Sequence, residues 1–336
     1  MNNSGKRNKK PTIKEIAALT GFSPATVSLV LNNKGSFPDE TRSAILQAFG
    51  ESEPKRGSSQ ELRYIRLMME ESTSSRVTDA YNSDIIAGIE SECQALGFEI
   101  ILSIVRSDHN VEQWTDGVAG IIMLGGGGIT DALIERVRSE RLPILLVDNY
   151  VHQGDVSSVH ADHYGAGFLA AQYLIDQGHR SIGFISGPAK YKPLVDRYAG
   201  YCAALMENGL PLNPHYVAPN EDRMFVKGFM EMKYLMELAD RPTAVFAVSD
   251  RAALGAVQAL EELGLVQGKD VELIGCDDIP DIRSLQPPIP TIRVPRIEVG
   301  QMAVRFLSAT IGGNRLPGKI VLPARLVRPE AAPDAN

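Results

Sequence analysis

Four side chains that follow predicted strands or open a predicted helix could together bind a polar small molecule. They are Asp148 after PILLV, Arg197 at the start of RYAGYCAAL, Ser249 after AVFAV, and Asp277 just after VELIG. Carboxylates and a guanidinium that converge on a cleft can form paired hydrogen bonds with vicinal hydroxyls or with the edge of a heterocycle. Asp is also the usual residue at strand-to-helix turns, so each position taken alone has a structural explanation.

Three other patterns suggest chemistry but have simpler explanations. The run Gly125 to Gly128 lacks the Gly-Lys-Ser/Thr of a phosphate loop, and we predict a strand-to-helix turn. The spacing His160-x-x-His163 suits a metal, but it is not HExxH on a clear helix and no Cys is near. A cation site and a solvated acidic turn would each account for three acids, Asp277, Asp278 and Asp281. No GxSxG motif, Cys–His pair or isolated carboxylate dyad is found, so we predict neither enzyme activity nor a metal or cofactor.

Two other classes of protein fit the sequence less well. A dinucleotide-binding enzyme would carry a glycine-rich turn after its first strand, where this chain has Glu70, Glu71 and Ser72. A secreted sugar-binding protein would begin with a signal peptide, but no apolar stretch follows the basic start MNNSGKRNKK.

From residue 64 onward, short apolar runs alternate with longer amphipathic segments. The runs predict strands over 64–69, 98–104, 119–124, 143–147, 181–186, 244–248 and 271–275. The segments between them predict helices that include 82–96, 130–140, 164–177, 197–208, 226–238, 251–263 and 296–309. Such alternation predicts parallel sheets with right-handed crossovers, divided into two α/β lobes near Asp162. Ligands of open α/β sheets bind at the carboxyl ends of strands, so the four candidate side chains would line a cleft between the lobes.

The residues before this core read as three short helices. TIKE has the form of a capping box with Thr12 as N-cap, and Gly21 ends the helix that follows. Ser23 then caps a second helix, and Pro38 opens a third. Two short helices joined by a tight glycine turn, with a third across them, indicate a helix-turn-helix, the alternative being a generic three-helix bundle.

Charge and cysteine content support this division of the chain. Residues 1–63 carry ten Lys and Arg against six acids, a net of +4, which leaves −11 for the rest of a chain whose net charge is −7. A basic head on an acidic body suits a protein in which only the head meets nucleic acid.

Three cysteines, Cys93, Cys202 and Cys276, are widely spaced and odd in number, which favours reduced thiols in a cytoplasm. No apolar run approaches the ~20 residues of a membrane span.

The head also resembles a known family. The segment TIKEIAALTGFSPATVSLVLNNKGSFPDETRSAIL is similar to the head of the LacI/GalR family of bacterial repressors, most specifically in Ala25-Thr-Val-Ser28, Val30-Leu-Asn32 and Glu40-Thr-Arg42. The rest of the chain is similar to that family's periplasmic-binding-protein-like core. The resemblance implies a homodimeric transcription regulator, expected to be a repressor, that binds double-stranded operator DNA. It also implies that a small-molecule effector, expected to be a sugar or a sugar phosphate, sets the DNA affinity.

The expected architecture is therefore a small all-α helix-turn-helix domain followed by a two-lobed α/β core with parallel sheets. We expect a basic disordered arm over 1–11, the helix-turn-helix domain over 12–50, a linker over 51–62, and an effector-binding and dimerisation core over 63–336. Lobe 1 is expected at about 63–160 and 292–320, and lobe 2 at about 162–290 and 321–332.

The resemblance also assigns DNA contacts. The second helix would enter the major groove with Pro24, Ala25 and Leu29 facing the bases. These side chains offer only apolar contact, for instance with thymine methyls, so specificity must lean on other residues, on DNA shape or on half-site spacing. The expected phosphate contacts are Ser23, Thr26, Ser28 and Asn32, and the first helix adds Thr12 and Lys14 to the DNA-binding set.

In the core, effector contacts of the family fall at positions matching Asp148, Arg197 and Asp277, and Ser249 is at an effector-facing position. The chain departs from the family where an aromatic side chain usually stacks on the effector, because Arg223 stands at that position. Three explanations remain open. Met224 or Phe225 takes the role in a shifted loop, Arg223 replaces stacking with charge for a phosphorylated or acidic effector, or the loop length differs.

The linker is a second departure. The family usually has a Leu-Gly-Tyr-x-Pro-like segment and a short hinge helix whose Leu enters the minor groove. Here the stretch from Ser52 to Ser59 is polar, and the only nearby Leu is Leu62. Pro, Gly and Ser are poor helix formers, so we predict a weakly ordered linker and less operator bending than is usual for the family.

Overall fold

The computed structural model describes residues 12–32, 37–49, 63–70, 80–105, 112–140, 142–151, 156–217, 224–314 and 318–329. The chain divides into two compact units, a head within residues 1–61 and a core within residues 62–336. The predicted arm over 1–11, the linker over 51–62 and the candidate residue Arg223 lie outside the described residues.

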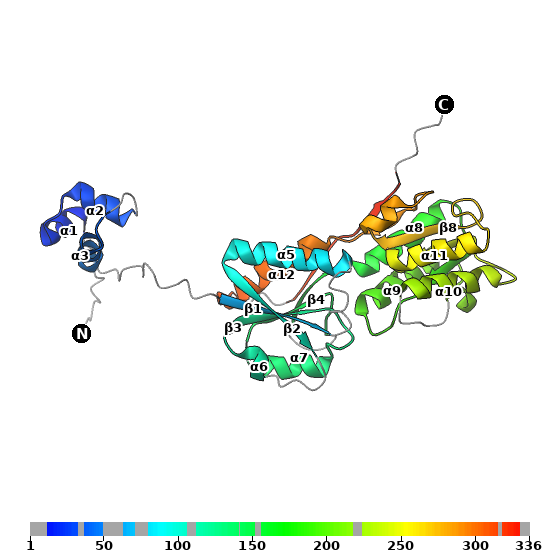
Figure 1. The fold of residues 1–336 in the computed structure, drawn as a ribbon, viewed down its shortest axis with the longest axis horizontal. Helices are drawn as coiled ribbons and strands as arrows, with labels where there is room; N and C mark the ends of the chain where they lie inside the picture. The colour runs from blue at the N-terminus through cyan, green and yellow to red at the C-terminus, as the bar shows by residue number, and fades with distance from the viewer. Residues whose placement is uncertain are drawn as a thin grey trace, which may run out of the picture. The chain divides into compact units, whose positions relative to one another are not determined.

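The head consists of three short helices around a very small apolar centre (Figure 1). They are α1 (Ile13–Thr20), α2 (Pro24–Leu31) and α3 (Asp39–Phe49). Gly21 takes a φ of 75° in the turn between α1 and α2, a conformation that glycine adopts without strain. Ser23 caps α2 by accepting a hydrogen bond from the Thr26 N–H at 3.1 Å. The predicted helix-turn-helix is therefore confirmed, and its centre is formed by Ile16, Val27, Val30 and Ile45.

Lobe 1 of the core is built on a six-stranded sheet with the order β10-β5-β4-β3-β1-β2, in which all neighbouring strands are parallel. The strands are β1 (Arg63–Glu70), β2 (Phe98–Val105), β3 (Val118–Leu124), β4 (Ile144–Val147), β5 (Ser157–Ala161) and β10 (Lys319–Leu322). Helices α5 (Ala80–Leu96) and α12 (Arg296–Ile311) cover one face, and α6 (Glu112–Thr115) and α7 (Asp131–Arg138) cover the other (Figure 1). The central strands β1, β3 and β4 are mostly buried, which explains why they read as nearly continuous apolar runs.

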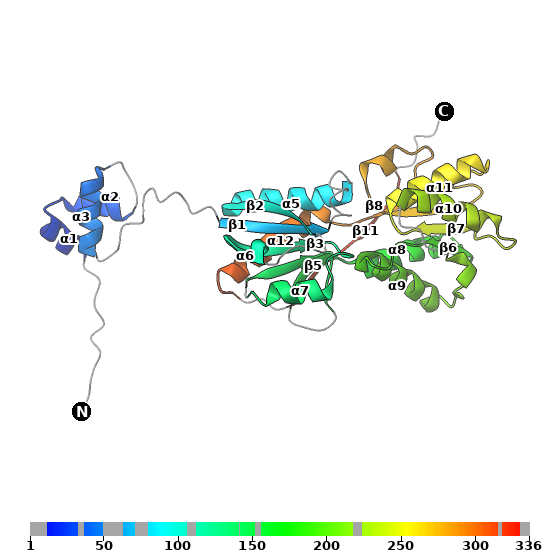
Figure 2. The same cartoon turned by 60° about the horizontal axis from the view of Figure 1, so that its bottom comes forward.

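Lobe 2 repeats this arrangement on a five-stranded sheet with the order β11-β9-β8-β7-β6. The strands are β6 (Ile182–Ile185), β7 (Ala244–Ala247), β8 (Glu272–Asp277), β9 (Thr291–Arg293) and β11 (Arg325–Val327). Only the β11–β9 pair is antiparallel among the described pairs. Helices α8 (His163–Asp176) and α9 (Lys192–Glu207) cover one face, and α10 (Met224–Glu237) and α11 (Asp250–Glu262) cover the other (Figure 2). Two short 3₁₀ helices, Pro214–Tyr216 and Pro280–Ser284, complete the lobe.

The chain passes between the lobes three times, after β5, after β9 and after β10. Residues 291–293 pair within lobe 2 and residues 321–322 within lobe 1, so the predicted boundaries at 290/292 and 320/321 were wrong by two or three residues. Four short strands, β5, β9, β10 and β11, were not predicted from the sequence; each has three to five residues. Within the described ranges, no helix is long and apolar enough to cross a membrane.

Candidate functional site

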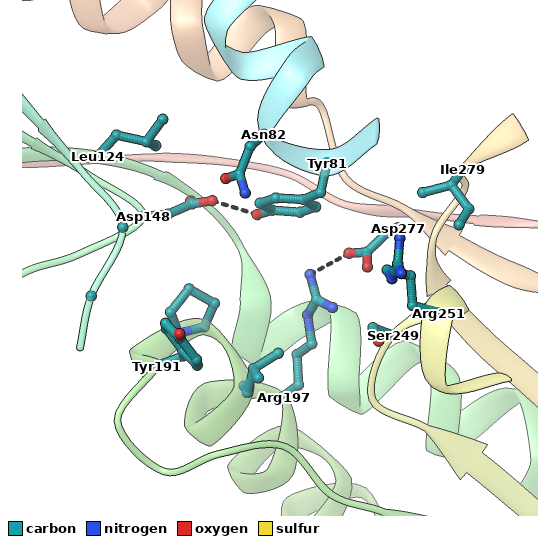
Figure 3. A pocket seen from close by; sticks show the side chains of 14 residues that line it. Tyr81, Asn82, Leu124, Asp148, Tyr191, Arg197, Ser249, Arg251, Asp277 and Ile279 are labelled. Atoms are coloured by element: carbon teal, nitrogen blue, oxygen red, sulfur yellow. Dashed lines mark hydrogen bonds and ion pairs between the residues drawn. The ribbon is translucent and has the colours of Figure 1, made fainter. Parts of the chain in front are cut away.

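Four of the five predicted effector residues line one cavity of the core. Asp148, Arg197, Ser249 and Asp277 surround a volume of about 130 Å³ at the carboxyl ends of β4, β7 and β8 (Figure 3). The rest of the lining was not predicted from the sequence and consists of Tyr81, Asn82, Leu124, Gly125, Gly126, Tyr191, Pro193, Leu194, Arg251 and Ile279. The cavity thus has a polar floor and walls that are largely apolar and aromatic, as small-molecule sites usually do.

Arg197 is held from lobe 2 and is almost completely buried, with 1% of its side chain exposed. It lies on the second turn of α9, which begins at Lys192, so the prediction that Arg197 opens the helix was wrong. Its Nη1 donates to the Val248 carbonyl at 2.7 Å, and its Nη2 donates to Asp277 Oδ1 at 2.7 Å. Burial alone would lower the pKa of Arg197, but the neighbouring Asp277 carboxylate outweighs burial and raises it. The guanidinium is therefore a fixed positive charge on the cavity floor.

Asp148 is held from lobe 1 by an unusual backbone conformation. Its φ of 49° is in the left-handed region that Asp tolerates better than most residues, and it turns the chain at the end of β4. The carboxylate accepts hydrogen bonds from the Tyr81 hydroxyl and, at 3.3 Å, from His163 Nε2. Burial alone would raise the pKa of Asp148, but these two hydrogen bonds lower it, so the group is a carboxylate. Burial and the Asp148 charge raise the pKa of Tyr81, which stays a donor.

Asp277, at the end of β8 in lobe 2, is hydrogen-bonded to arginines from both lobes. It ends β8 with a φ of 126°, and its backbone carbonyl accepts a hydrogen bond from Arg296 Nη1. Arg296 is the first residue of α12 and also donates through Nε and Nη2 to Asp84 Oδ2 on α5, at 3.0 and 2.7 Å. The orientation of Asp277 is therefore set by contacts to both lobes.

Ser249 and Asp250 have different roles although they are adjacent. Ser249 is the N-cap of α11, where its Oγ accepts the Ala252 N–H at 3.3 Å and its own hydroxyl proton can be donated to a ligand. Asp250 accepts hydrogen bonds from Thr291 Oγ1 at 2.7 Å and from the Ile279 N–H at 2.9 Å. Burial, reinforced by the charge of Asp277, raises the pKa of Asp250 to about 7. Asp250 is thus a buried structural group behind the cavity.

A second set of contacts joins the two lobes at the rim of the cavity. Tyr150 follows β4 in lobe 1, and its hydroxyl donates to Asp196 Oδ1 on α9 at 2.8 Å. Lys192 on α9 donates to the Tyr150 carbonyl and lies 3.5 Å from Asp131 Oδ1 of α7. The ammonium group of Lys319 lies 4.3 Å from the centre of the Tyr150 ring. This arrangement provides a polar latch between the lobes that lies outside the cavity.

The other patterns of the sequence have structural explanations. Gly125 to Gly128 form the predicted turn between β3 and α7, and the buried Glu70 carboxylate accepts the Gly128 N–H there. The interpretation of Asp278 as part of a solvated acidic turn was wrong. Its side chain is 1% exposed and forms ion pairs with two arginines, Arg283 and Arg293. Among the described residues no group of His, Cys, Asp and Glu is arranged to hold a metal ion. His163 lies between Asp148 and Arg197 instead, a role that its spacing from His160 did not suggest.

The candidate DNA contacts of the head lie on its surface. On α2, Pro24, Ala25 and Leu29 are exposed, whereas Val27 and Val30 point into the centre of the head. Ser23, Asn32, Thr12 and Lys14 are also exposed, and Thr26 and Ser28 are half-buried. The Asn32 amide donates to the Ser28 carbonyl at 2.8 Å, so it also closes the end of the helix. One face of α2 thus presents all the predicted base-facing side chains together.

Comparisons with known proteins bear on both units. The pattern of the bacterial regulatory proteins, lacI family, matches residues 12–53, and that of a periplasmic binding protein-like domain matches residues 171–329. The ribose operon repressor of Haemophilus influenzae is 32% identical over 305 residues, which are 88% of this chain and 90% of that repressor.

Two solved structures are similar over nearly the whole chain. One is the complex of the transcriptional regulator CelR with cellobiose, at 28% identity and a TM-score of 0.72, covering 95% of this chain and 99% of that one. The other is the lac repressor dimer bound to operator and the anti-inducer ONPF, at 25% identity and a TM-score of 0.71, covering 95% and 98%.

Proposed function

The chain belongs to the LacI family of bacterial regulatory proteins, and from this premise we propose that it is a homodimeric transcriptional repressor. Its affinity for operator DNA is set by a small molecule bound in the cavity between the two lobes. The observation that carries the proposal is the convergence of Asp148 from one lobe with Arg197, Ser249 and Asp277 from the other around one cavity. Cytoplasmic location and the absence of catalysis are parts of the same proposal, because the named relatives are repressors and regulators.

The chemistry of the cavity favours a sugar or a sugar derivative as the effector. Carboxylates and a guanidinium on the floor suit paired hydrogen bonds to vicinal hydroxyls, and the Tyr81 and Tyr191 side chains supply aromatic walls. A volume of about 130 Å³ is small for a ligand site and favours a compound with one ring. The names of two relatives also point to sugars, since one is a ribose operon repressor and the other is bound to cellobiose, although the cavity volume favours a sugar smaller than this two-ring compound.

The effector would act by favouring closure of the lobes. A ligand that contacts Asp148 and Arg197 at once binds more tightly when the lobes are close, and it shifts the lobes toward that state by this difference in affinity. The hydrogen bond between Tyr150 and Asp196 at the rim would also stabilise the closed state. In a dimer, closure would change the spacing of the two heads and therefore the fit to two half-sites.

The head would dock with α2 in the major groove. Pro24, Ala25 and Leu29 offer apolar contact to base edges, and the hydroxyls of Ser23 and Thr26 at the start of the helix are placed for phosphates. Sequence preference would therefore come in large part from DNA shape and half-site spacing.

A thermal-shift screen followed by gel shifts tests the proposal. The panel consists of D-ribose, cellobiose, other sugars, sugar phosphates and nucleobases. A true effector at 100 times its Kd should stabilise the core by about 2.7 kcal/mol and should change the gel shift with genomic fragments. A compound that binds Arg197→Ala and Asp277→Ala as well as wild type would place the effector site elsewhere. If the chain shifted no genomic fragment, the proposed function as a repressor would be contradicted.

A further inference from the structure

A ring of contacts runs through both lobes at the cavity. Six of its links are hydrogen bonds, one of which goes to the backbone carbonyl of Asp277. Its members in order are Tyr81, Asp148, His163, Arg197, Asp277, Arg296 and Asp84. The ring closes on itself because Tyr81 and Asp84 are neighbours one turn apart on α5. Figure 3 shows two of its links, Tyr81 to Asp148 and Arg197 to Asp277.

His163 is the link between the two lobes on one side of this ring. It is the first residue of α8, directly after the chain leaves β5 of lobe 1, and it is 2% exposed. Its Nε2 lies 3.3 Å from Asp148 Oδ1. Its Nδ1 lies 3.3 Å from both Nε and Nη2 of Arg197. The imidazole therefore contacts the Asp148 carboxylate of lobe 1 and the Arg197 guanidinium of lobe 2 at the same time.

These partners determine which nitrogen carries the proton. A guanidinium can only donate, so Nδ1 must accept from Arg197 with its lone pair. The proton of the imidazole is then on Nε2, where it is donated to the Asp148 carboxylate. Only a side chain with one donor and one acceptor can fill this place.

Backbone packing keeps His163 and Arg197 at this spacing. Helices α8 and α9 cross at Gly167 and Gly200, and a Cβ built on Gly167 would lie only 1.9 Å from the Arg197 carbonyl oxygen. A Cβ on Gly200 would lie 2.0 Å from the Tyr164 carbonyl oxygen. The helices therefore cannot separate or slide without losing this contact, and the imidazole has a fixed gap to span.

We infer that His163 is a positioning residue of the effector site. It holds Asp148 of lobe 1 and Arg197 of lobe 2 in the arrangement in which both can contact one ligand. The ligand part of this inference rests on the proposed function, whereas the ring itself does not. The competing role is that of a packed core histidine, for which an apolar side chain of similar volume would serve equally well.

Two variants of the full chain separate these roles. His163→Gln keeps one donor and one acceptor, and His163→Leu keeps only the volume. Hydrogen exchange of backbone amides is measured at residues 148–151 in lobe 1 and 194–198 in lobe 2. His163→Leu should raise exchange in both segments by about tenfold or more, since it removes one hydrogen-bond partner from each of two buried charged groups, Asp148 and Arg197. His163→Gln should restore exchange to near wild type.

The matched control is His179→Leu, which removes a histidine of the same lobe that contacts Thr243 outside the cavity. It should leave exchange in both segments unchanged. Wild-type exchange in His163→Leu, a rise in only one segment, or equal effects of Gln and Leu would each overturn the inference. Failure of His163→Gln to fold would count against it as well.

A second measurement covers the case in which His163→Leu does not fold. In wild-type protein labelled with ¹⁵N-histidine, the NMR signal that disappears in His163→Gln should show a proton on Nε2 and a bare Nδ1. A proton on Nδ1, alone or together with Nε2, would overturn the assignment. Neither measurement uses an effector, so a screen without hits would contradict the proposed function and leave the role of His163 in the ring standing.

Discussion

The head and the cavity would both contact ligands, but they are built in opposite ways. The predicted base-facing residues of α2 are exposed, close in sequence, and supported by a centre of four apolar side chains. The polar residues of the cavity are buried, come from segments as far apart as Asp148 and Asp277, and already have partners in the protein. The difference teaches where a substitution acts, on binding alone in the head and on both folding and binding in the cavity.

This contrast follows from the solvent that each ligand displaces. An exposed side chain such as Leu29 costs the fold little, because water surrounds it in the free protein. A buried guanidinium such as Arg197 is tolerated only when acceptors surround it, so its partners must be in place before any ligand arrives. Substitutions at matched residues in the two regions therefore test whether the head and the cavity differ in this way.

The largest expected effect is that of Arg197→Met. The substitution leaves the buried Asp277 carboxylate without its partner, and breaking such a pair costs about 3–5 kcal/mol. Urea denaturation should show this loss, and effector titration should show no response. Gel shifts without effector should stay near wild type, because the head is a separate unit. Arg138→Met is the control, since Arg138 pairs with Glu135 at the exposed surface of α7, and it should change little. If both variants lost the same free energy of unfolding, buried pairs of the cavity would matter no more to the fold than exposed pairs.

The next effect is a pH dependence confined to the core. The pKa of Asp250 is raised to about 7 from 3.8, so the fold favours its protonated form. This contribution is fully present below pH 3.8 and is lost as the pH rises through 7, at no more than about 1.4 kcal/mol per pH unit. Asp250→Asn does not titrate, so it should gain stability relative to wild type between pH 5 and pH 7. Urea denaturation at both values measures the difference. If the difference between Asp250→Asn and wild type were the same at both pH values, the assignment of the raised pKa to Asp250 would be refuted.

A smaller effect is expected on the exposed face of α2. Leu29→Ala should weaken operator binding by about 1 kcal/mol, or about fivefold in Kd, because it removes apolar contact with a base edge. Its effect on the free energy of unfolding should be small, since 43% of the side chain is exposed. The control is Leu19→Ala on α1, where 74% of the side chain is exposed. Gel shifts at one fixed salt concentration compare the two, and equal losses would mean that α2 is not the reading helix.

The same contrast explains what the sequence could predict. The helix-turn-helix depends on local signals such as Gly21 and Ser23, which act within a few residues and can be read from the letters. Asp148 and Asp277 were found because parallel sheets bring the carboxyl ends of strands to one edge. In each of these cases the signal lies in the residue itself or next to it.

The remaining features depend on contacts between distant segments. His163 was considered only as half of a metal pattern, and nothing near it in sequence announces Asp148 and Arg197 as its partners. For Asp278 a cation site and a solvated turn both stayed open, because nothing next to it in sequence indicates that Arg283 and Arg293 pair with it. Tyr81, which α5 supplies to the cavity, lies just before the predicted start of that helix at residue 82. Spatial convergence of this kind leaves no periodic signal.

The smallest expected effect concerns the latch at the rim of the cavity. Tyr150→Phe removes the hydroxyl that donates to Asp196 across the lobes, at a cost of about 0.5–1 kcal/mol to the closed state. Because the effector selects that state, its Kd should rise by about two- to fivefold, with little change in unfolding by urea. Tyr201→Phe is the matched control, since the Tyr201 hydroxyl donates to the Ile182 carbonyl within lobe 2. It should lower stability and leave the effector Kd unchanged. If Tyr201→Phe weakened effector binding as much as Tyr150→Phe, the rim contact would be part of the general packing of the core and not a latch on closure.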